Sequence, residues 1–588
     1  MFAPLFLGFD LSTQALKASA ISLHSDQVVV SASVNFDKDL AHHETSNGSV
    51  VSPAGDGEVT APVALFLEAI DLVMQRLKDA GLEFGRVLAV GGAAQQHGSV
   101  YWSSAATTLL ADLKSNESIL SQLSPEAFSL QNAPIWQDSS TAQECRVLEE
   151  AVGGPQKLSD LTGSRAYERF TASQILKVAS RTPDVYARTA HISLISSFLT
   201  SLFLGRIAPV EIADASGMNL MNVHTNKYDE TLLDVCSGGT GKGAELREKL
   251  GGEPVMGGTN MGKVSHWWVE RFGFNSDCIV TPFTGDNPSS IVMLSSPGDA
   301  ILSLGTSTTL LVSIPPSPAP PKCTTTSHIL SHPTTPGGSI AMLCYKNGGL
   351  IREAVRDTHT SKCWNEFNEL LRSTPAGNNN AFGFYFTLRE IIPDGVEGEH
   401  FFHGTARVEP TDLSPAAHAR AVLESQLMSV KTRLKAILPD EGGLKRCIVT
   451  GGSSTNEAFQ QICADVLHLP VYVADASGSA TVGGALLARW GWYKATGYDG
   501  ATEDIPFEAT REGGGISVRL VAEPHPETVE VYHGLVDTYN QNEAEVIKTC
   551  LERDAAKSAS QVDLAEEPAQ HKHGLLTSLL RSLGFTIA

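Results

Sequence analysis

Residues 5–23 read LFLGFDLSTQALKASAISL, two apolar runs that predict β-strands joined by a short polar turn. Residues 300–314, AILSLGTSTTLLVSI, repeat this order of strand, Gly/Ser/Thr turn and strand. A spacing of roughly 300 residues is too long for a solenoid repeat. We therefore expect two related domains, each opening with a hairpin whose turn is suited to holding phosphate.

The composition is that of an ordinary globular protein, with 588 residues, 42% of them hydrophobic and 18% charged. This length exceeds a single core, so we expect two large domains or two lobes around a cleft. The net charge of −22 argues against non-specific nucleic-acid binding. It leaves anionic ligands open, because backbone N–H groups, helix N-termini and Mg²⁺ all hold phosphate.

The cysteines and the first residues of the chain indicate the expected cellular compartment of the protein. The nine cysteines are scattered without a CxxC pair, and the histidines complete no zinc spacing, which favours a reduced compartment without disulfides. The start, MFAPLFLGFD, lacks a basic segment and is predicted to be the first strand, not a signal peptide. No run of about 18 apolar residues predicts a membrane span. We expect a cytoplasmic protein without a membrane partner.

Strand-like runs alternate with helical runs along the chain, which predicts an α/β fold. Residues 86–98, RVLAVGGAAQQHG, predict a buried strand that enters a glycine-rich loop. Residues 64–81 predict a helix that Gly81 ends, with one apolar face made of Phe66, Ile70, Val73 and Leu77.

Three segments look irregular. Residues 314–338 are rich in Pro and Thr and predict a loop, neither a central strand nor a helix. Residues 105–132 predict a surface insertion with a short helix or two. From about residue 553 we expect a disordered linker. It ends in a short amphipathic helix that docks on the protein, frays, or touches a partner or membrane, with one face made of Leu575, Leu576, Leu579, Leu580 and Leu583.

Two carboxylates follow apolar runs. Asp10 ends the first predicted strand, where a carboxylate is costly unless it is paired or binds a metal ion. The alternative is an Asx-type turn at the hairpin. Asp286 lies in TPFTGDNPSS, residues 281–290, among small and turn-forming residues. The alternative is that Asp286 has a structural role and caps a turn.

Other polar side chains occupy predicted loops of the first half. Each is more often structural when taken alone. Together they form a set of acid, amide, imidazole and guanidinium groups that suits a polyhydroxylated ligand, consisting of Gln96, His97, Trp136, Asp138, Arg165 and Arg169.

Glycine-rich turns mark the second half. A strand stops at Gly451-Gly452 before a helix, and paired glycines there allow an anionic or flat ligand to approach the backbone. Residues 302–309, LSLGTSTT, offer hydroxyls and N–H groups around Gly305. The alternatives are a plain tight turn and an ordinary hairpin turn. SGGTGKG at 237–243 departs from the P-loop pattern at both ends and is rejected.

Taken in order, these motifs resemble the FGGY family of carbohydrate kinases over roughly residues 5–495. The resemblance implies two actin-like (ribonuclease H-like) domains with a deep cleft between them, the sugar on the first and ATP mostly on the second. We place the domains at 1–290 and 291–552, with a flexible tail at 553–588. The motifs are GFDLSTQALK, GAAQQHGSVYW, PIWQDSSTAQEC, LTGSRAYERFTASQI, ASGMNLMNV, FTGDNPSS, LSLGTSTT, CYKNGGLIRE and VTGGSSTNEAFQQICADVL.

The resemblance also implies an activity. QQHG and SRAYERF are similar to members that phosphorylate xylulose rather than glycerol or ribulose. This implies ATP-dependent conversion of D-xylulose to D-xylulose 5-phosphate in pentose phosphate metabolism, with Mg²⁺, by a monomer or homodimer. The alternatives are a kinase of this family for ribulose or ribitol, a non-catalytic actin-like ATP-binding module, and a sugar-free ATPase.

By the same resemblance, Asp286 is the catalytic base that accepts the proton of the primary hydroxyl of the sugar. The first turn reads Asp-Leu-Ser-Thr where much of the family has Asp-x-Gly-Thr, and Ser12 restricts the backbone there. Trp364 has a core position as its alternative. The implied sites are the ketose site, with His97, Arg169, Asp286 and Asn287; the Mg²⁺ and phosphate site, with Asp10, Ser12, Thr13 and Gln14; and the nucleotide site, with Gly305, Thr306, Ser307, Trp364, Gly452, Ser453 and Asn456.

Overall fold

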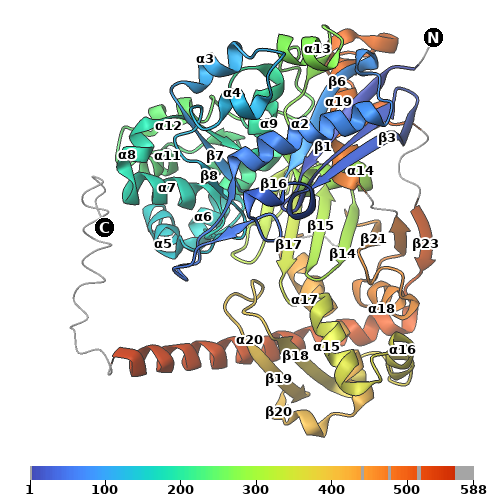
Figure 1. Cartoon of the computed structure of the whole chain (residues 1–588). Coiled ribbons are helices and arrows are strands. Elements are labelled where there is room, and N and C mark those ends of the chain that lie inside the picture. The colour runs from blue at the N-terminus through green and yellow to red at the C-terminus, as the bar shows by residue number, and fades with distance from the viewer. Residues whose placement is uncertain (1–2, 439–442, 475–477, 513–517, 563–588) are drawn as a thin grey trace.

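A computed structural model describes residues 3–438, 443–474, 478–512 and 518–562. It is an α/β protein built on two large mixed sheets, with helices on their faces (Figure 1). The expected α/β class and the two related sheets are therefore present. Within the described ranges, no helix is both long and apolar enough to cross a membrane.

The first sheet has the strand order β12-β6-β1-β2-β3, and β13 pairs with β6 beside this path. β1 (Leu5–Leu11) and β2 (Ala15–Ser22) form the antiparallel hairpin predicted at residues 5–23. β1 also runs parallel to β6 (Val87–Ala94), the predicted buried strand. The other strands are β3 (Ser25–Asn35), β12 (Ile279–Val280) and β13 (Thr284–Gly285).

The second sheet has the order β16-β17-β15-β14-β21-β22-β23. Its segment β22-β21-β14-β15-β17 matches β12-β6-β1-β2-β3 strand for strand, including which neighbours are parallel. The predicted repeat is thus a repeat of topology. The strands are β14 (Asp299–Leu304), β15 (Thr308–Ile314), β16 (His328–Ser331), β17 (Ser339–Tyr345), β21 (Arg446–Thr450), β22 (Val471–Ala474) and β23 (Val518–Ala522).

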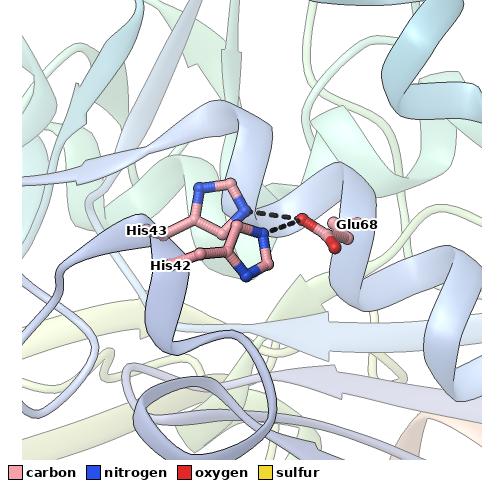
Figure 2. A group of neighbouring side chains, drawn as sticks. All are labelled: His42, His43 and Glu68. Atoms are coloured by element: carbon pink, nitrogen blue, oxygen red, sulfur yellow. Dashed lines mark hydrogen bonds and ion pairs between the residues drawn. The ribbon is translucent and has the colours of Figure 1, made fainter.

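Helix α2 (Val63–Asp79) contacts β2 and β3 of the first sheet and forms where a helix was predicted. Its predicted apolar face is buried, and Gly81 follows its end with a φ of +90°. A turn before it, made of α1 (Phe36–Asp39) and the 3₁₀ helix η1 (Ala41–His43), points two histidines toward Glu68 of α2 (Figure 2).

The insertion at 105–132 contains two short helices, α3 (Ala106–Ala111) and α4 (Ile119–Leu123), as expected. Their buried apolar residues belong to the core of the first sheet, so the insertion covers that core and is not a peripheral loop. Small strands and helices complete this part: β4 (Val50–Val51), β5 (Val59–Pro62), β7 (Ser99–Ser103), β8 (Asn132–Pro134), β9 (Thr189–Leu194), β10 (Met221–Asn222), β11 (Lys227–Tyr228), α5 (Ala142–Ala151), α6 (Pro155–Thr162), α7 (Thr171–Arg181), α8 (Pro183–Arg188), α9 (Ile195–Leu204), α10 (Ile212–Ala215), α11 (Glu230–Cys236), α12 (Gly243–Lys249) and α13 (His266–Phe272).

Two helices connect the sheets. α14 (Asp286–Leu294) runs from β13 toward β14 and buries Ile291 and Leu294 against the second sheet. α19 (Ser479–Thr496) lies on β1, β6 and β2 of the first sheet, although it comes late in the sequence. Glycines permit this contact, because a Cβ on Gly8 would lie 1.9 Å from the Thr481 carbonyl oxygen. The domain boundary at residue 290 stays a prediction.

The tail differs from the prediction. α20 (Pro526–Val562) continues through residues 553–562, where a disordered linker was expected. Polar contacts extend onto this helix, since Arg553 donates to the Glu397 carbonyl at 3.1 Å and Arg389 pairs with Asp554 at 2.9 Å. The predicted leucine-rich helix lies outside the described residues. The neighbouring elements are α15 (Gly349–His359), α16 (Trp364–Arg372), α17 (Pro415–Ile437), α18 (Glu457–Leu467), β18 (Ala381–Phe386), β19 (Gly398–His403) and β20 (Ala406–Val408).

The Pro-rich loop also differs in part. β16 forms inside residues 314–338 and pairs with β17 at the edge of the second sheet. The prolines lie outside its four residues, and an edge strand needs only one hydrogen-bonded side. β16 reaches the first domain, because Ile329 donates to the Gly163 carbonyl at 2.8 Å.

Candidate active site

The carboxyl ends of three parallel strands meet at one edge of the first sheet. Asp10 of β1 is level with Ala93 of β6, which is level with Thr284 of β13. Ligand sites of open α/β sheets lie at such an edge. The chain therefore brings together the residues that follow these strand ends: Ser12, Thr13, Gln95, Gln96, His97, Asp286 and Asn287.

Asp286 is the first residue of α14 and its side chain is half-buried. Its Oδ1 accepts hydrogen bonds from the backbone N–H of Asn287 at 2.8 Å and from its Nδ2 at 3.2 Å. Burial, together with the negative charges of Asp10 and Asp214, raises the pKa of Asp286 to about 7. A carboxylate with this pKa is a far better proton acceptor near neutral pH than an exposed aspartate.

Asp10 is buried, and Ser12 Oγ donates to its Oδ2 at 2.6 Å. Burial raises its pKa, against the hydrogen bond of Ser12 and the charge of Lys17. Within the described residues its Oδ1 has no hydrogen-bond partner. A buried carboxylate oxygen without a donor is costly unless a cation completes it, so Asp10 fits a hard cation such as Mg²⁺.

A second layer of acids lies behind this edge. Asn287 Nδ2 donates to Gln96 Oε1 at 3.0 Å, and the Gln96 amide in turn lowers the pKa of Asp214. Burial outweighs that effect and raises the pKa of Asp214 to about 7, with the charge of Glu211 adding to the rise. Burial likewise raises the pKa of Glu211 to about 7. The sequence analysis missed both acids, although ASGMNLMNV begins directly after Asp214, because an acid in a short helical run looks like a surface residue.

His97 is buried and held with a φ of +72°, which is uncommon outside glycine. Its Nδ1 lies 2.8 Å from the Gly217 carbonyl, which can only accept, so the ring proton is on Nδ1. Burial and the charge of Arg169 lower the pKa of His97 to about 3. The neutral ring therefore presents Nε2 as an acceptor, which suits a sugar hydroxyl.

Arg169 spans the two domains. Its guanidinium lies 4.6 Å from the ring centre of Tyr167 and 5.1 Å from that of Phe170. Its Nη2 lies 3.3 Å from Nε2 of His328, which belongs to β16 of the second sheet. Burial and the charge of Arg169 lower the pKa of His328. A neutral His328 accepts from Arg169, so the guanidinium is positioned from both sides.

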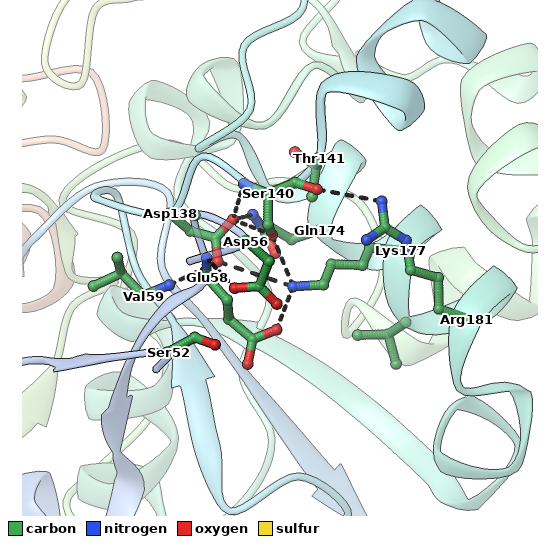
Figure 3. Close-up of polar contacts among 12 residues, drawn as sticks. Ser52, Asp56, Glu58, Val59, Asp138, Ser140, Thr141, Gln174, Lys177 and Arg181 are labelled. Carbon is green, nitrogen blue, oxygen red and sulfur yellow. Dashed lines mark hydrogen bonds and ion pairs between the residues drawn. The ribbon is translucent and has the colours of Figure 1, made fainter. Parts of the chain in front are cut away.

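Two members of the predicted polar set are paired with protein groups, and their role toward a ligand stays a prediction. Arg165 forms ion pairs with Glu149 at 3.1 Å and Asp394 at 3.0 Å. Asp138 is enclosed by donors in a buried network (Figure 3). Trp136 is half-exposed, and its Nε1 donates to Thr13 Oγ1 at 2.8 Å.

The network around Asp138 fastens β5 and the segment after β8 to α7. Asp138 Oδ1 accepts from Gln174 Nε2 at 2.7 Å, and Oδ2 accepts from the N–H of Val59 at 3.0 Å. Lys177 of α7 adds an ion pair with Glu58 at 2.6 Å (Figure 3). These contacts hold the first domain together around Asp138.

The corresponding edge of the second sheet opens into a pocket of about 870 Å³. Ser303 of β14 is level with Thr450 of β21, so the turns after these strands lie side by side. The pocket brings together six residues predicted for the nucleotide: Gly305, Thr306, Trp364, Gly452, Ser453 and Asn456.

Glycines shape this pocket. Gly451 has a φ of +86°, and a Cβ there would lie 2.9 Å from the carbonyl carbon of Leu304. Gly452 faces open space, because a Cβ on it would meet no atom within 4 Å. The backbone at Gly452 is therefore accessible to a ligand, as anion sites built from N–H groups require.

Trp364 and Asn456 each have a structural contact as well. Trp364 begins α16 with its ring half-buried, 4.4 Å from the Arg356 guanidinium and edge-on to Phe459 at 5.7 Å. Asn456 caps α18, because its Oδ1 accepts from the N–H of Ala458 at 3.0 Å. Both residues thus belong to the wall of the pocket and to its support.

Arg352 of α15 was not predicted. It is 1% exposed and lies under the β14–β15 turn, where Nη2 is 3.4 Å from the Gly305 carbonyl. Its strongest contact is Nη1 to Gln426 Oε1 at 2.7 Å, and in the described part of the chain it forms no ion pair with a carboxylate. Burial lowers its pKa to about 10, so it stays charged. It places a positive charge behind the pocket.

Comparison with known proteins gives consistent matches. Models of the N- and C-terminal domains of the FGGY family of carbohydrate kinases match residues 123–292 and 300–492. A protein of Aspergillus flavus named "Probable D-xylulose kinase A" is 40% identical over 587 residues, covering 93% of this chain and 99% of that protein. A "Xylulose kinase" of Mus musculus is 39% identical, covering 92% of this chain and 94% of its own.

A solved structure, that of xylulose kinase from Rhodospirillum rubrum, superposes with a TM-score of 0.74 at 16% identity. It covers 93% of this chain and 99% of that chain. At this identity the likeness concerns the fold alone.

Proposed function

The chain belongs to the FGGY family of carbohydrate kinases, and from this premise we propose that it transfers the γ-phosphoryl group of ATP to the 5-hydroxyl of D-xylulose. The observation that carries the proposal is Asp286, a carboxylate with a pKa of about 7 that begins the helix between the two domains. Relatives named xylulose kinase, similar over nearly the whole chain, support the choice of sugar.

In this proposal Asp286 accepts the proton of the primary hydroxyl as that oxygen attacks the γ-phosphorus. Phosphoryl transfer passes through a loose transition state, so positioning and charge neutralisation supply most of the acceleration. The Asn287 side-chain amide donates to both Gln96 Oε1 and Asp286 Oδ1 and so orients the carboxylate. A proton acceptor that is both oriented and matched to neutral pH is what this reaction requires.

The sugar would lie between Asp286 and the His97–Arg169 pair. His97 Nε2 would accept from one hydroxyl and the Arg169 guanidinium would donate to a sugar oxygen. The Asn287 amide hydrogens already go to Gln96 and Asp286, so its side-chain oxygen would accept from another hydroxyl. Arg169 also contacts His328 of the second domain, so sugar binding and the placement of the two domains are coupled at this residue. We expect the domains to close on the sugar and ATP, which would exclude water from the transfer.

Nucleotide binding is assigned to the pocket of the second sheet. Gly305 and Thr306 would face the phosphates, and Trp364, Gly452, Ser453 and Asn456 would surround the adenosine. Asp10 would hold Mg²⁺ with the Ser12–Gln14 turn, since its Oδ1 lacks a partner within the described chain. When bound, Mg²⁺ neutralises charge on the transferred group.

The test is ADP release with Mg-ATP, measured with D-xylulose, D-ribulose, ribitol, glycerol and no sugar. We expect strong stimulation by D-xylulose and a higher kcat/KM for it than for the other compounds. A higher kcat/KM for another compound would change the proposed substrate but would still support kinase activity. Nucleotide binding without stimulation by any sugar would instead support a non-catalytic ATP-binding module. The monomer or homodimer state and the cytoplasmic location stay predictions.

A further inference from the structure

His42, His43 and Glu68 converge on the surface of the first domain (Figure 2). Nε2 of His42 lies 2.8 Å from Glu68 Oε2, and Nε2 of His43 lies 2.7 Å from the same oxygen. The ligand atoms of the three residues all lie within 4.8 Å of one another. We propose that these residues form a binding site for a divalent transition metal ion of the zinc class, separate from the Mg²⁺ site of phosphoryl transfer.

The donor set suits such an ion. Zinc is bound by imidazole nitrogens and carboxylate oxygens, and three protein ligands with one water form a common tetrahedral site. Magnesium prefers oxygen ligands, so two imidazoles select against it.

The nitrogen-to-oxygen distances need a modest adjustment. Bond lengths of about 2.0–2.2 Å put neighbouring ligand atoms of a tetrahedral site about 3.3–3.6 Å apart. The two nitrogen-to-oxygen separations are therefore about 0.5–0.9 Å too short for a bound ion. His42 is 60% exposed and Glu68 is 29% exposed, so both side chains have room to move apart.

The backbone that carries the histidines is firmly held. The η1 turn brings the two rings together, with centroids 4.5 Å apart and ring planes tilted by 38°. Asp39, just before this turn, pairs with Arg76 at 2.8 Å. Arg76 lies eight residues after Glu68, on the same side of α2. This ion pair ties the turn to α2, the helix that carries Glu68, before any ion binds, which reduces the entropy lost on binding.

Residues 36–48, which carry the two histidines, pack on the Ser12–Gln14 turn of the first hairpin. Phe36 donates its N–H to the Gln14 carbonyl at 3.0 Å. A Cβ on Gly48 would lie 1.9 Å from the Thr13 carbonyl oxygen, so this glycine touches the turn directly. An ion that joins the η1 turn to α2 would therefore brace the segment on which Ser12–Gln14 rests. We expect bound metal to raise the thermal stability of the first domain.

The experiment is a calorimetric titration of Zn²⁺ into tag-free, EDTA-treated full-length protein, with millimolar Mg²⁺ present to fill oxygen sites. We compare wild type with His42→Ala, His43→Ala and Glu68→Gln, and with His24→Ala, an exposed histidine of the β2–β3 turn, as the control. Loss of a direct ligand should weaken binding by at least the 10- to 100-fold typical of outer-shell changes. His24→Ala should bind like wild type.

Co²⁺ absorption identifies the ligands independently of affinity. The nine cysteines are free and are the main competitors for a soft ion. Visible bands of a nitrogen- and oxygen-bound ion, lost in Glu68→Gln, would support the site. Thiolate charge-transfer bands, or Zn²⁺ affinities equal in all five proteins, would overturn it. Because His42 is mostly exposed, His42→Ala should fold normally and keeps the test valid if another variant does not.

Discussion

The two sheets have the same strand order, yet their edges carry opposite chemistry. At the first edge, the penultimate residue of β1 is a buried aspartate, Asp10. The equivalent residue of β14, at the second edge, is Ser303. Acids gather at the first edge, and the pKa values of Asp286 and Asp214 rise to about 7. At the second edge the turns are built of glycine and hydroxyl residues, over the buried charge of Arg352.

The topology provides a location for a ligand in each domain, and the side chains determine which ligand that location suits. An edge formed by parallel strand ends presents backbone groups and room for a ligand in both domains. Acids at the first edge suit a neutral polyol that must lose a proton. Backbone N–H groups and a buried guanidinium at the second edge suit polyphosphate. A substitution at one edge should leave the function of the other edge intact.

The largest effect is expected for Asp286→Asn. The amide cannot accept the hydroxyl proton, so kcat should fall by roughly 10²-fold or more, while D-xylulose and ATP affinities change little. Steady-state kinetics and calorimetric titration with each ligand measure this. Unchanged kcat would remove Asp286 from the role of base. Lost ATP binding in a folded variant would show that the two edges are not independent.

The pH dependence should reflect the same carboxyl group. Asp286 must be ionised to accept a proton, so kcat/KM for the sugar should fall about tenfold per pH unit below pH 7, and not at all in Asp286→Asn. The pKa is raised from 3.8 to about 7 in the folded protein, so the native state binds this proton more tightly than the unfolded chain. Its contribution to stability is therefore lost as pH rises from about 4 to about 7.

Unfolding provides the control for that prediction. In ligand-free protein, Asp286→Asn should melt like wild type near pH 4 and at a higher temperature near pH 8. After allowance for solvent screening we expect a gain of about 1 kcal/mol, which is about 2–4 °C. A pH-independent difference would mean that the carboxyl group is not held protonated by its surroundings, and the acid character of the first edge would need another explanation.

A matched pair of glycines tests the second edge. Gly451→Ala forces a left-handed residue against Leu304 and should cost about 1–2 kcal/mol of stability and raise the KM for ATP. Gly452→Ala meets open space in the ligand-free protein, so its stability should be unchanged and only the KM for ATP should rise. Thermal melts and ATP kinetics separate the two. An unchanged KM for ATP in Gly452→Ala would remove this backbone from the nucleotide site.

The smallest effect is expected for Arg352→Met. Loss of the buried charge should weaken ATP binding by about 10-fold, without a change in D-xylulose affinity, because the guanidinium acts through the β14–β15 turn. Arg407→Met, at an exposed arginine of β20, is the control for removing one positive charge. Equal ATP affinity in both variants would show that Arg352 only supports the fold.

Much of the fold could be predicted because its signals are local. Alternating apolar runs and Gly/Ser/Thr turns defined both hairpins, and a 3.6-residue period defined α2. The linker prediction failed at residues 553–562, because α20 gains contacts with distant residues such as Glu397 and Arg389. β16 was missed because its partner strand, and not its own sequence, makes it a strand.

The candidate site shows the same limit. Motifs singled out Asp10, His97 and Asp286, and the strand ends bring them to one edge. Arg165 and Asp138 looked similar in sequence but are occupied by protein partners. Asp214 and Arg352 carry no local signal, because what distinguishes them is burial beside residues remote in sequence.

Short-range sequence patterns are enough to predict the two hairpins, the alternation of strands and helices, and the acids and glycines at the strand ends. Which charges are buried together depends on how distant segments pack. The pKa of Asp286 depends on Asp10 and Asp214, which are far from it along the chain. The His42–His43–Glu68 cluster likewise exists only because α2 folds back beside the η1 turn. Electrostatic and ligand-binding properties are set by distance in space, which a one-dimensional pattern does not specify.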